Sequence, residues 1–255
     1  MPNAKSFGLW LRCFGGDAPA IVRPWNSLPA VLVLVSGFFL IGCDSQAPSA
    51  SESKEFWEWF SGHSSDYAQL FSRDGQATNN LLREKDAEKA AVDTASRLKA
   101  INHDFAPFFG YSEGLNQLII TTGGRKQSFA AADQFVATAP QVRGWRFVAL
   151  KPPRKFDPNT EIQSGVMTLR VGDMRYTRAA HGEGAFAFTI FIHADVSETP
   201  GAYRKLCTQL LEDSLGERLA AKAVRGVEVR ELSAAAVPQT YDFVDVYRDV
   251  SGAVQ

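Results

Sequence analysis

The stretch NQLIITTGGRKQSFAAADQFVATAPQVRGWRFVALK, residues 116–151, decides the fold. Its two ends, 116–122 and 145–151, are short runs rich in β-branched and aromatic residues, which are typical of strands. Apolar side chains recur at helical spacing between them, at Phe129, Ala132, Phe135 and Val136. Pro140 ends this predicted helix, which spans 126–139. A strand, a helix and a second strand in this order predict two parallel strands joined by a right-handed crossover.

The same order of elements is expected twice in the chain. A further strand at 105–111 precedes the stretch quoted above, so this part has the order strand, strand, helix, strand. The second part has expected strands at 174–180, 185–193 and 226–232, with an amphipathic helix that starts after Thr199-Pro200. The sequence therefore predicts an α+β fold, a two-layer sandwich in which two ββαβ halves form one mixed sheet with helices on one face.

Two helical regions are expected before the first strand. Segment 54–71, KEFWEWFSGHSSDYAQLF, has aromatic side chains at helical spacing, and Gly62 is a candidate point for a break. Segment 79–101 is rich in Ala, Leu, Glu and Lys, which favour helices. We expect a single α+β domain over 54–232, with a short edge strand at 165–171 and a C-terminal tail at 233–255.

The chain begins with a predicted export signal. The apolar run 28–42 has 15 residues, fewer than the roughly 20 that a membrane-spanning helix needs. An apolar run of this length behind Arg23 is typical of a secretory signal peptide. It ends in Leu40-Ile41-Gly42-Cys43, which resembles the lipobox of bacterial lipoproteins. The resemblance implies that 1–42 is removed and that Cys43 receives lipid, with acyl chains such as palmitate.

The residues after Cys43 predict where the chain is held. Segment 43–53 is small and polar, so we expect a flexible tether behind the lipidated cysteine. Asp44 resembles the signal that retains lipoproteins of enteric-type bacteria in the inner membrane, which disfavours the outer membrane. The expected location is therefore the periplasmic face of the inner membrane, with the membrane as partner through the lipid on Cys43.

Composition excludes some classes of partner and bond. Of the 27 basic and 28 acidic residues, segment 1–42 holds Lys5, Arg12, Arg23 and Asp17, so the remaining 213 residues carry a net charge of about −3. This balance does not suit nucleic-acid binding, which normally requires a basic excess. Once Cys43 carries lipid, Cys207 is the only cysteine left, so no disulfide is expected within the mature chain.

Two signatures resemble those of a bacterial family of uncharacterised proteins, known as a domain of unknown function. One is Phe56-Trp57-x-Trp59-Phe60, and the other runs from Pro140 to Pro152 through Gly144-Trp145 and Lys151. The signature residues are Trp57, Trp59, Gly144, Trp145 and Pro152. The family is loosely similar in element order to the protein inhibitors of ribonuclease E, and it implies no catalytic residues.

Basic residues near the crossover are candidates for anion binding. Gly123-Gly124 precedes Arg125 and Lys126 just before a predicted helix, where free backbone N–H groups favour a phosphate or a carboxylate. Arg146 and Lys151 lie on the strand after that helix. The alternatives are a tight turn with solvated charges, and a strand whose Trp145 fills the core while Arg146 points the other way.

The sequence predicts no catalytic residue, metal site or cofactor. The histidines at 63, 103, 181 and 193 lack metal-binding spacing; His63 is expected in the core, and Cys207 is expected as a buried thiol. The favoured hypothesis is a lipid-anchored, non-catalytic module that binds a protein or another envelope component. The alternative is a small periplasmic hydrolase that uses His181, Glu183 or an Arg/Lys/His anion-binding site.

Overall fold

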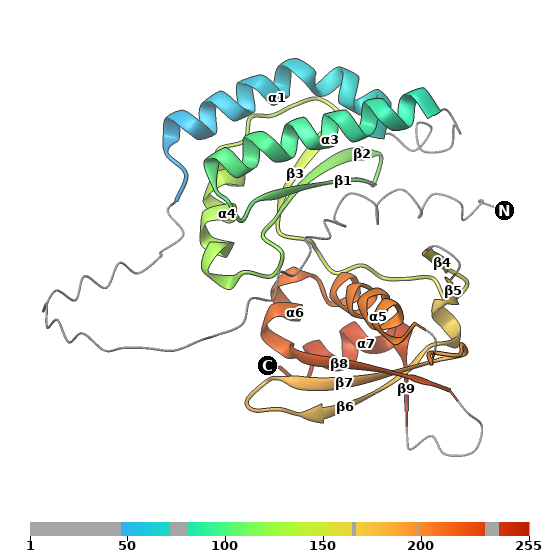
Figure 1. Cartoon of the computed structure of the whole chain (residues 1–255). Coiled ribbons are helices and arrows are strands. Elements are labelled where there is room, and N and C mark those ends of the chain that lie inside the picture. The colour runs from blue at the N-terminus through green and yellow to red at the C-terminus, as the bar shows by residue number, and fades with distance from the viewer. Residues whose placement is uncertain (1–46, 72–80, 165–166, 198, 233–239, 255) are drawn as a thin grey trace, which may run out of the picture.

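The computed structural model of the 255-residue chain describes residues 47–71, 81–164, 167–197, 199–232 and 240–254 (Figure 1). The predicted signal peptide 1–42, the lipidation site Cys43 and the retention signal Asp44 lie outside these residues. Within the described part, no helix has both the length and the apolar composition that crossing a bilayer demands.

The N-terminal half consists of three helices and a three-stranded sheet. In chain order its elements are α1 (Ala50–Phe71), α3 (Leu81–Ile101), β1 (Ala106–Ser112), β2 (Leu115–Thr121), the 3-10 helix η3 (Lys126–Ser128), α4 (Phe129–Ala137) and β3 (Trp145–Ala149). The sheet order is β1-β2-β3. Strand β2 pairs antiparallel with β1 and parallel with β3, so α4 is the predicted crossover helix.

The C-terminal half repeats this order with additional elements. They are β4 (Glu161–Ser164), β5 (Met167–Arg170), η4 (Val171–Asp173), β6 (Arg175–Ala180), β7 (Phe186–Ile192), α5 (Pro200–Leu215), α6 (Glu217–Ala223), β8 (Val224–Glu231), β9 (Tyr241–Asp242), η5 (Phe243–Asp245) and α7 (Val246–Ser251). The main sheet has the order β8-β7-β6-β9, and β4 pairs with β5 in a separate hairpin. Strand β7 is antiparallel to β6 and parallel to β8.

The predicted α+β class and the two ββαβ halves are confirmed, but the single shared sheet is wrong. The halves have separate sheets, and they lie one above the other in Figure 1. After β3 the chain enters Pro152-Pro153, which have no N–H groups to extend a sheet, and it then crosses to the C-terminal helices. Each sheet is therefore covered by its own helices, and each half is a two-layer unit.

The two halves have separate hydrophobic cores on the helix-covered faces of their sheets. In the N-terminal half, α1, α3 and α4 pack on Phe109, Leu118 and Trp145. In the C-terminal half, α5, α6 and α7 pack on Tyr176, Phe188 and Ile190. Helices on one face of each sheet agree with the sequence-based expectation.

The signature tryptophans are fixed by hydrogen bonds or ring contacts in the N-terminal half. Trp57 donates from Nε1 to the Phe135 carbonyl at 3.2 Å, and Trp145 donates to the Ser64 carbonyl at 3.0 Å. Trp59 is only partly buried, and the Arg97 guanidinium lies 4.3 Å from its ring centroid. Gly144 has φ +80°, so the turn before β3 uses a backbone conformation that favours glycine.

Helix α1 differs from the expectation at its start and its middle. It begins at Ala50, inside the segment predicted as tether, because Ser49 and Glu52 form a capping box: Ser49 Oγ accepts from the Glu52 N–H at 3.2 Å, and Glu52 Oε2 accepts from the Ser49 N–H at 3.0 Å. It continues through Gly62 without a break. The prediction that His63 is buried is wrong: the residue is exposed, and its Nδ1 lies 2.8 Å from the Trp59 carbonyl oxygen.

The last predicted helix is divided, and the predicted tail contains ordered elements. Gly216, at φ +74°, separates α5 from α6. Within the tail segment 233–255, the short strand β9 pairs with β6, and Phe243, Val246 and Val250 are buried in the C-terminal core. The C-terminal half is therefore completed by residues beyond its last predicted strand.

Candidate functional site

The two halves meet where the parallel strands β2 and β3 end. Because these strands run in the same direction, the loop after Thr121 and the loop after Ala149 lie at one edge of the N-terminal sheet. The start of α6 meets this edge: the Glu217 N–H donates to the Lys151 carbonyl at 2.8 Å. We call this contact region the junction, defined by residues 121–125, 150–154 and 213–218.

A buried carboxylate, Glu217, is the centre of the junction. Its side chain accepts hydrogen bonds from the Thr121 hydroxyl, the Thr122 hydroxyl and the Thr122 N–H, each at 2.8 Å. It also accepts from the N–H groups of Gly124 at 3.0 Å and Lys151 at 3.1 Å. Every one of these donors belongs to the loops at the edge of the N-terminal sheet, so one side chain of the C-terminal half binds two loops of the other half.

The Glu217 carboxylate is held in its ionised form. Burial acts to raise the pKa of Glu217, but the hydrogen bonds from Gly124, Thr121, Lys151 and Thr122 together outweigh burial and keep that pKa below its ordinary value. The residue is only 7% exposed, and its two oxygens already accept five hydrogen bonds. Glu217 is therefore a structural anion and has no free lone pair with which to act as a general base.

Glycine at position 216 permits the close approach of the two halves. A Cβ atom there would lie 2.6 Å from the Pro153 nitrogen and 2.9 Å from its Cδ, well inside van der Waals contact. The backbone beside it is also paired across the junction, since the Arg154 N–H donates to the Asp213 carbonyl at 2.8 Å. The break between α5 and α6 thus places Glu217 against the loops that bind it.

Two ion pairs flank the Glu217 site. Arg218 Nη2 contacts Asp133 Oδ2 of α4 at 2.6 Å, and Lys151 Nζ lies 3.6 Å from Asp213 Oδ1. Burial raises the pKa of Asp213, while the positive charges of Lys151 and Arg154 oppose that rise. Both pairs join one half of the molecule to the other and add to the hydrogen bonds of Glu217.

The predicted anion-binding residues do not gather at one point. Arg125 lies at the junction edge, but its Nε contacts the buried Asp104 carboxylate at 3.1 Å. Lys126 opens η3 and is exposed, and Lys151 follows β3 at the same edge of the sheet. Arg146 lies near the opposite end of β3, where its Nη2 contacts Glu113 at 2.8 Å. The Gly123-Gly124 loop does bind a carboxylate, which is supplied by Glu217 of the same chain.

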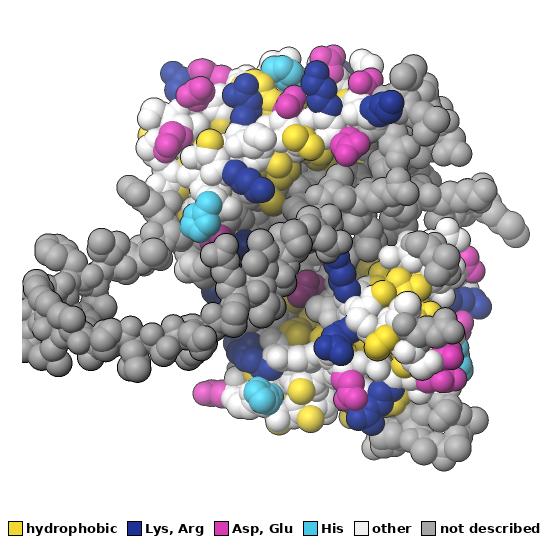
Figure 2. All heavy atoms as spheres, in the orientation of Figure 1, with side chains coloured by type: hydrophobic (Ala, Val, Ile, Leu, Met, Phe, Trp, Pro, Cys, Tyr) yellow, Lys and Arg dark blue, Asp and Glu magenta, His cyan; other side chains and the backbone are white. Residues whose placement is uncertain are grey.

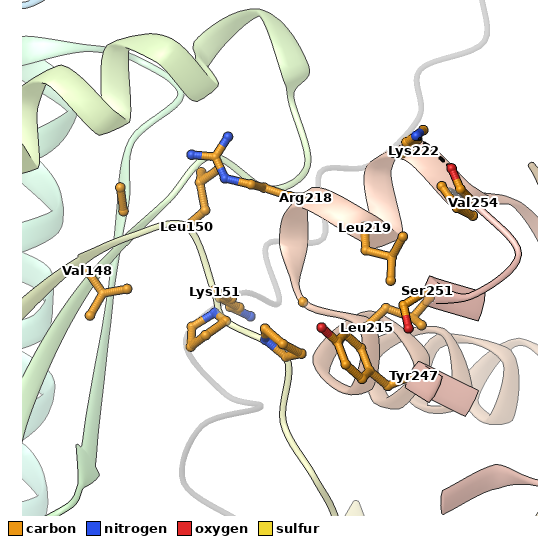
Figure 3. A pocket seen from close by; sticks show the side chains of 14 residues that line it. Val148, Leu150, Lys151, Leu215, Arg218, Leu219, Lys222, Tyr247, Ser251 and Val254 are labelled. Atoms are coloured by element: carbon orange, nitrogen blue, oxygen red, sulfur yellow. Dashed lines mark hydrogen bonds between the residues drawn. The ribbon is translucent and has the colours of Figure 1, made fainter. Parts of the chain in front are cut away.

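A cleft of about 710 Å³ opens beside the junction (Figure 3). One wall is the end of β3 and the segment Lys151-Pro152-Pro153; the other is formed by the α5–α6 region, α7 and the C-terminal residues. Its lining residues are Val148, Ala149, Leu150, Lys151, Pro152, Pro153, Leu215, Gly216, Arg218, Leu219, Lys222, Tyr247, Ser251 and Val254. The signature residue Pro152 and the predicted anion-binding residue Lys151 thus both line the cleft.

The charge of the cleft is of one sign. The described lining includes the basic residues Lys151, Arg218 and Lys222 and contains no Asp or Glu. In the space-filling view, basic side chains lie among hydrophobic ones on the C-terminal half where it faces the N-terminal half (Figure 2). This combination of apolar walls and positive charge suits an anionic ligand that also has apolar surface.

The residues named for a hydrolase are not brought together. His181 and Glu183 are exposed in the turn between β6 and β7, whereas Arg125 and Arg146 contact Asp104 and Glu113 of the other half. None of these four residues lines the cleft. Cys207 is fully buried in the C-terminal core, and burial raises the pKa of its thiol to about 12. The hydrolase hypothesis therefore finds no assembled site in the described ranges.

Sequence reasoning missed Glu217, although a signal was present. An acidic residue directly after Gly216, inside the apolar stripe of a predicted helix, indicates a break with a carboxylate at the new helix start. The partner loops are 66 to 96 positions away in the chain, so spacing alone does not connect them.

No protein-family model, no curated protein sequence and no solved structure matches the chain significantly.

Proposed function

We propose that this chain is a non-catalytic module, held by a lipid on Cys43 at the periplasmic face of the inner membrane, whose cleft binds an envelope component. The observation that carries the proposal is the cleft beside the junction, where apolar walls and three basic residues meet without an acidic residue. Its 710 Å³ lies within the range of about 300–1,000 Å³ that small-molecule sites occupy.

The buried ionisable groups near the cleft support binding rather than catalysis. Glu217 is occupied by five hydrogen bonds, and Asp104 accepts from Ser128 Oγ at 2.6 Å and contacts Arg125. The described residues include no group of three His, Cys, Asp or Glu side chains that would hold a metal ion. The lining of the cleft suits the recognition of charge and apolar shape.

The proposed anchor keeps the module near the membrane. The seven residues from Cys43 to Ser49 can reach at most about 25 Å when fully extended. Because α1 begins directly afterwards, the lipid on Cys43 would hold the folded part close to the bilayer surface. A component of the envelope would therefore meet the cleft at high effective concentration.

A pair of photo-crosslinkers tests the binding proposal. Tyr247 lines the cleft and is 44% exposed, whereas Tyr111 lies on β1, away from the cleft, and is 40% exposed. Replacing each in turn with p-benzoylphenylalanine in the full chain, and irradiating native membranes, should yield a specific adduct by mass spectrometry from position 247 alone. Identical adduct patterns from the two positions would refute binding in the cleft.

A pair of cysteine variants tests the anchor. The wild-type chain and Cys207→Ala should partition into the detergent phase of Triton X-114 and carry an acyl mass at residue 43. Cys43→Ser should move to the aqueous phase without that mass. Lipid mass that persists in Cys43→Ser would show that the anchor lies elsewhere.

A further inference from the structure

The body of the cleft holds apolar side chains together with Lys151 and Arg218, and Lys222 lies apart from them at one end (Figure 3). Figure 3 shows Val148, Leu150, Leu215 and Leu219 along the body of the cleft, and Lys222 with Val254 at one end. Pro152 and Pro153 add to the apolar lining of the cleft. A ligand with charge at one end and apolar surface along its length would match this arrangement.

Lys222 is the basic residue of the cleft whose charge is least neutralised. Lys151 lies near Asp213, and Arg218 is paired with Asp133. Lys222 donates from Nζ to the Val254 carbonyl at 3.2 Å, and no ion pair with a carboxylate is found for it among the described residues. A neutral carbonyl leaves the positive charge available for one anionic group.

Two hydroxyl groups also line the cleft. Tyr247 and Ser251 line the cleft from α7, and Figure 3 shows the Tyr247 hydroxyl directed toward the space between Leu215 and Lys151. Ser251 Oγ already donates to the Arg248 carbonyl at 3.2 Å, whereas the described residues provide no acceptor for the Tyr247 hydroxyl. This hydroxyl lies away from Lys222 and adds a polar group to the body of the cleft.

We infer that the cleft binds an amphipathic anion, a single apolar chain or ring system that ends in one carboxylate or phosphate. The head group contacts Lys222, and the apolar part lies along Leu219, Leu215 and the two prolines. This inference rests on the proposed binding function and specifies the chemistry of its ligand. The same chemistry is found in free fatty acids, in alkyl phosphates and in membrane phospholipids.

The test uses the lipidated chain reconstituted in phosphatidylcholine vesicles. A diazirine analogue of dodecanoate is photolysed, and the labelled peptides are mapped by mass spectrometry. We expect label on segments 215–222 and 247–254. Dodecanoate and dodecyl phosphate should compete with it, whereas dodecanol and dodecyltrimethylammonium, which have the same chain without the anion, should not. A photoactivatable phosphatidylglycerol in a parallel experiment shows whether an intact membrane lipid enters or only a free amphiphile.

Matched lysine variants assign the effect to the cleft. Lys222→Met keeps the length of the side chain and removes its charge, and labelling should fall about tenfold, the value of one charge-assisted hydrogen bond. Lys126→Met removes an exposed lysine that does not line the cleft and should leave labelling unchanged. Both variants should retain the far-ultraviolet circular dichroism and thermal unfolding midpoint of the wild-type chain.

Failure of this inference is distinguishable from failure of the proposed function. Equal labelling of Lys222→Met and Lys126→Met, or competition by dodecyltrimethylammonium as strong as by dodecanoate, would overturn the amphipathic anion. If the crosslinker at position 247 still captures a specific membrane component, the binding function stands with another ligand. If position 247 and position 111 give the same adducts, the binding function itself is wrong.

Discussion

The two halves of the molecule have the same order of elements and fill their cores differently. The N-terminal core is dominated by aromatic rings, with Phe56, Trp57, Phe60, Tyr67, Phe71, Phe105, Phe109, Phe135 and Trp145 buried together. The C-terminal core is mainly aliphatic, with Leu, Ile, Val and Met side chains around Tyr176, Phe188 and Phe243. One topology thus accommodates two kinds of packing.

The difference is related to the helices that cover each sheet. The crossover helix α4 has 9 residues, whereas α5 has 16 and is continued by α6. A short helix covers little of a sheet, so α1 adds large rings and α3 adds smaller side chains, including Ala87, Ala90 and Leu98, to complete the N-terminal layer. In the C-terminal half, the tail elements η5 and α7 add side chains to those of α5 and α6, and Ile162, Leu169 and Val171 of β4, β5 and η4 are buried with them. Element order sets the topology, and helix length decides what further cover the core requires.

The halves also differ in their spectroscopic signal, which makes the comparison testable. Trp57, Trp59 and Trp145 are all in the N-terminal half, and the described C-terminal half contains no tryptophan. Trp10 and Trp25 lie in segment 1–42, so in a chain that begins at Cys43 tryptophan fluorescence follows the N-terminal half, while circular dichroism follows both halves.

The largest expected effect is the loss of a core side chain. Phe60 is fully buried and contacts the rings of Trp57, Tyr67 and Trp145, so Phe60→Ala should lower the free energy of unfolding by about 3–5 kcal/mol. Leu211→Ala in the other core should cost about 2–5 kcal/mol. Because the junction joins the halves, both variants should shift the denaturant midpoint seen by tryptophan fluorescence. A wild-type fluorescence midpoint in Leu211→Ala would show instead that the halves unfold independently.

The next effect concerns the close contact between the halves. Gly216→Ala places a Cβ 2.6 Å from the Pro153 nitrogen at a residue with φ +74°, which should cost on the order of 3 kcal/mol through overlap and backbone strain. Chemical denaturation followed by circular dichroism measures this loss. Stability within 0.5 kcal/mol of the wild-type chain would mean that the junction can open at little cost.

The Glu217 site should make stability depend on pH. Glu217→Gln replaces one accepting oxygen by an amide N–H₂ group, which then faces an N–H donor such as that of Lys151, and it removes the charge. The substitution should lower the free energy of unfolding by about 1.5–3 kcal/mol at neutral pH. The pKa of Glu217 is lowered in the folded state, so its stabilisation is present above the pKa of the unfolded chain and is lost as the pH falls through the folded-state pKa.

The difference in unfolding free energy between the wild-type chain and Glu217→Gln should therefore be constant from about pH 7 to pH 5.5. It should shrink below the ordinary glutamate pKa of about 4.3. Denaturant titrations at several pH values measure it, with Glu58→Gln on the exposed side of α1 as control. A difference that grows on acidification would contradict a lowered pKa.

The smallest effect is a gain in the N-terminal half. Gly62 is exposed within α1, and a Cβ there would meet no atom within 4 Å. Gly62→Ala should stabilise the chain by about 0.5–1 kcal/mol because alanine favours the helix. It is also the matched control for Gly216→Ala, and thermal unfolding should move the two variants in opposite directions. A loss of stability in Gly62→Ala would mean that α1 needs flexibility at this point.

Much of the fold follows from local patterns. The alternation of residues in the strands, the apolar stripes of α4 and α5 and the turn at Gly144 lie within short segments, so the sequence predicts them directly. The capping box of Ser49 and Glu52 was equally local and available, and it explains why α1 begins earlier than expected. For the Gly123-Gly124 loop the sequence left two alternatives, an anion site and a tight turn with solvated charges, and it did not point to Glu217.

What the sequence by itself determined is therefore the α+β class and the two ββαβ units, because each depends on neighbours along the chain. Only the tertiary structure decided that the two units have separate sheets, that Glu217 binds the Gly123-Gly124 loop, and that a basic, apolar cleft lies beside it. The physical reason is distance along the chain: Glu217 and its partners Thr121, Thr122 and Gly124 are 93 to 96 positions apart. Their contact depends on how two separately built cores dock.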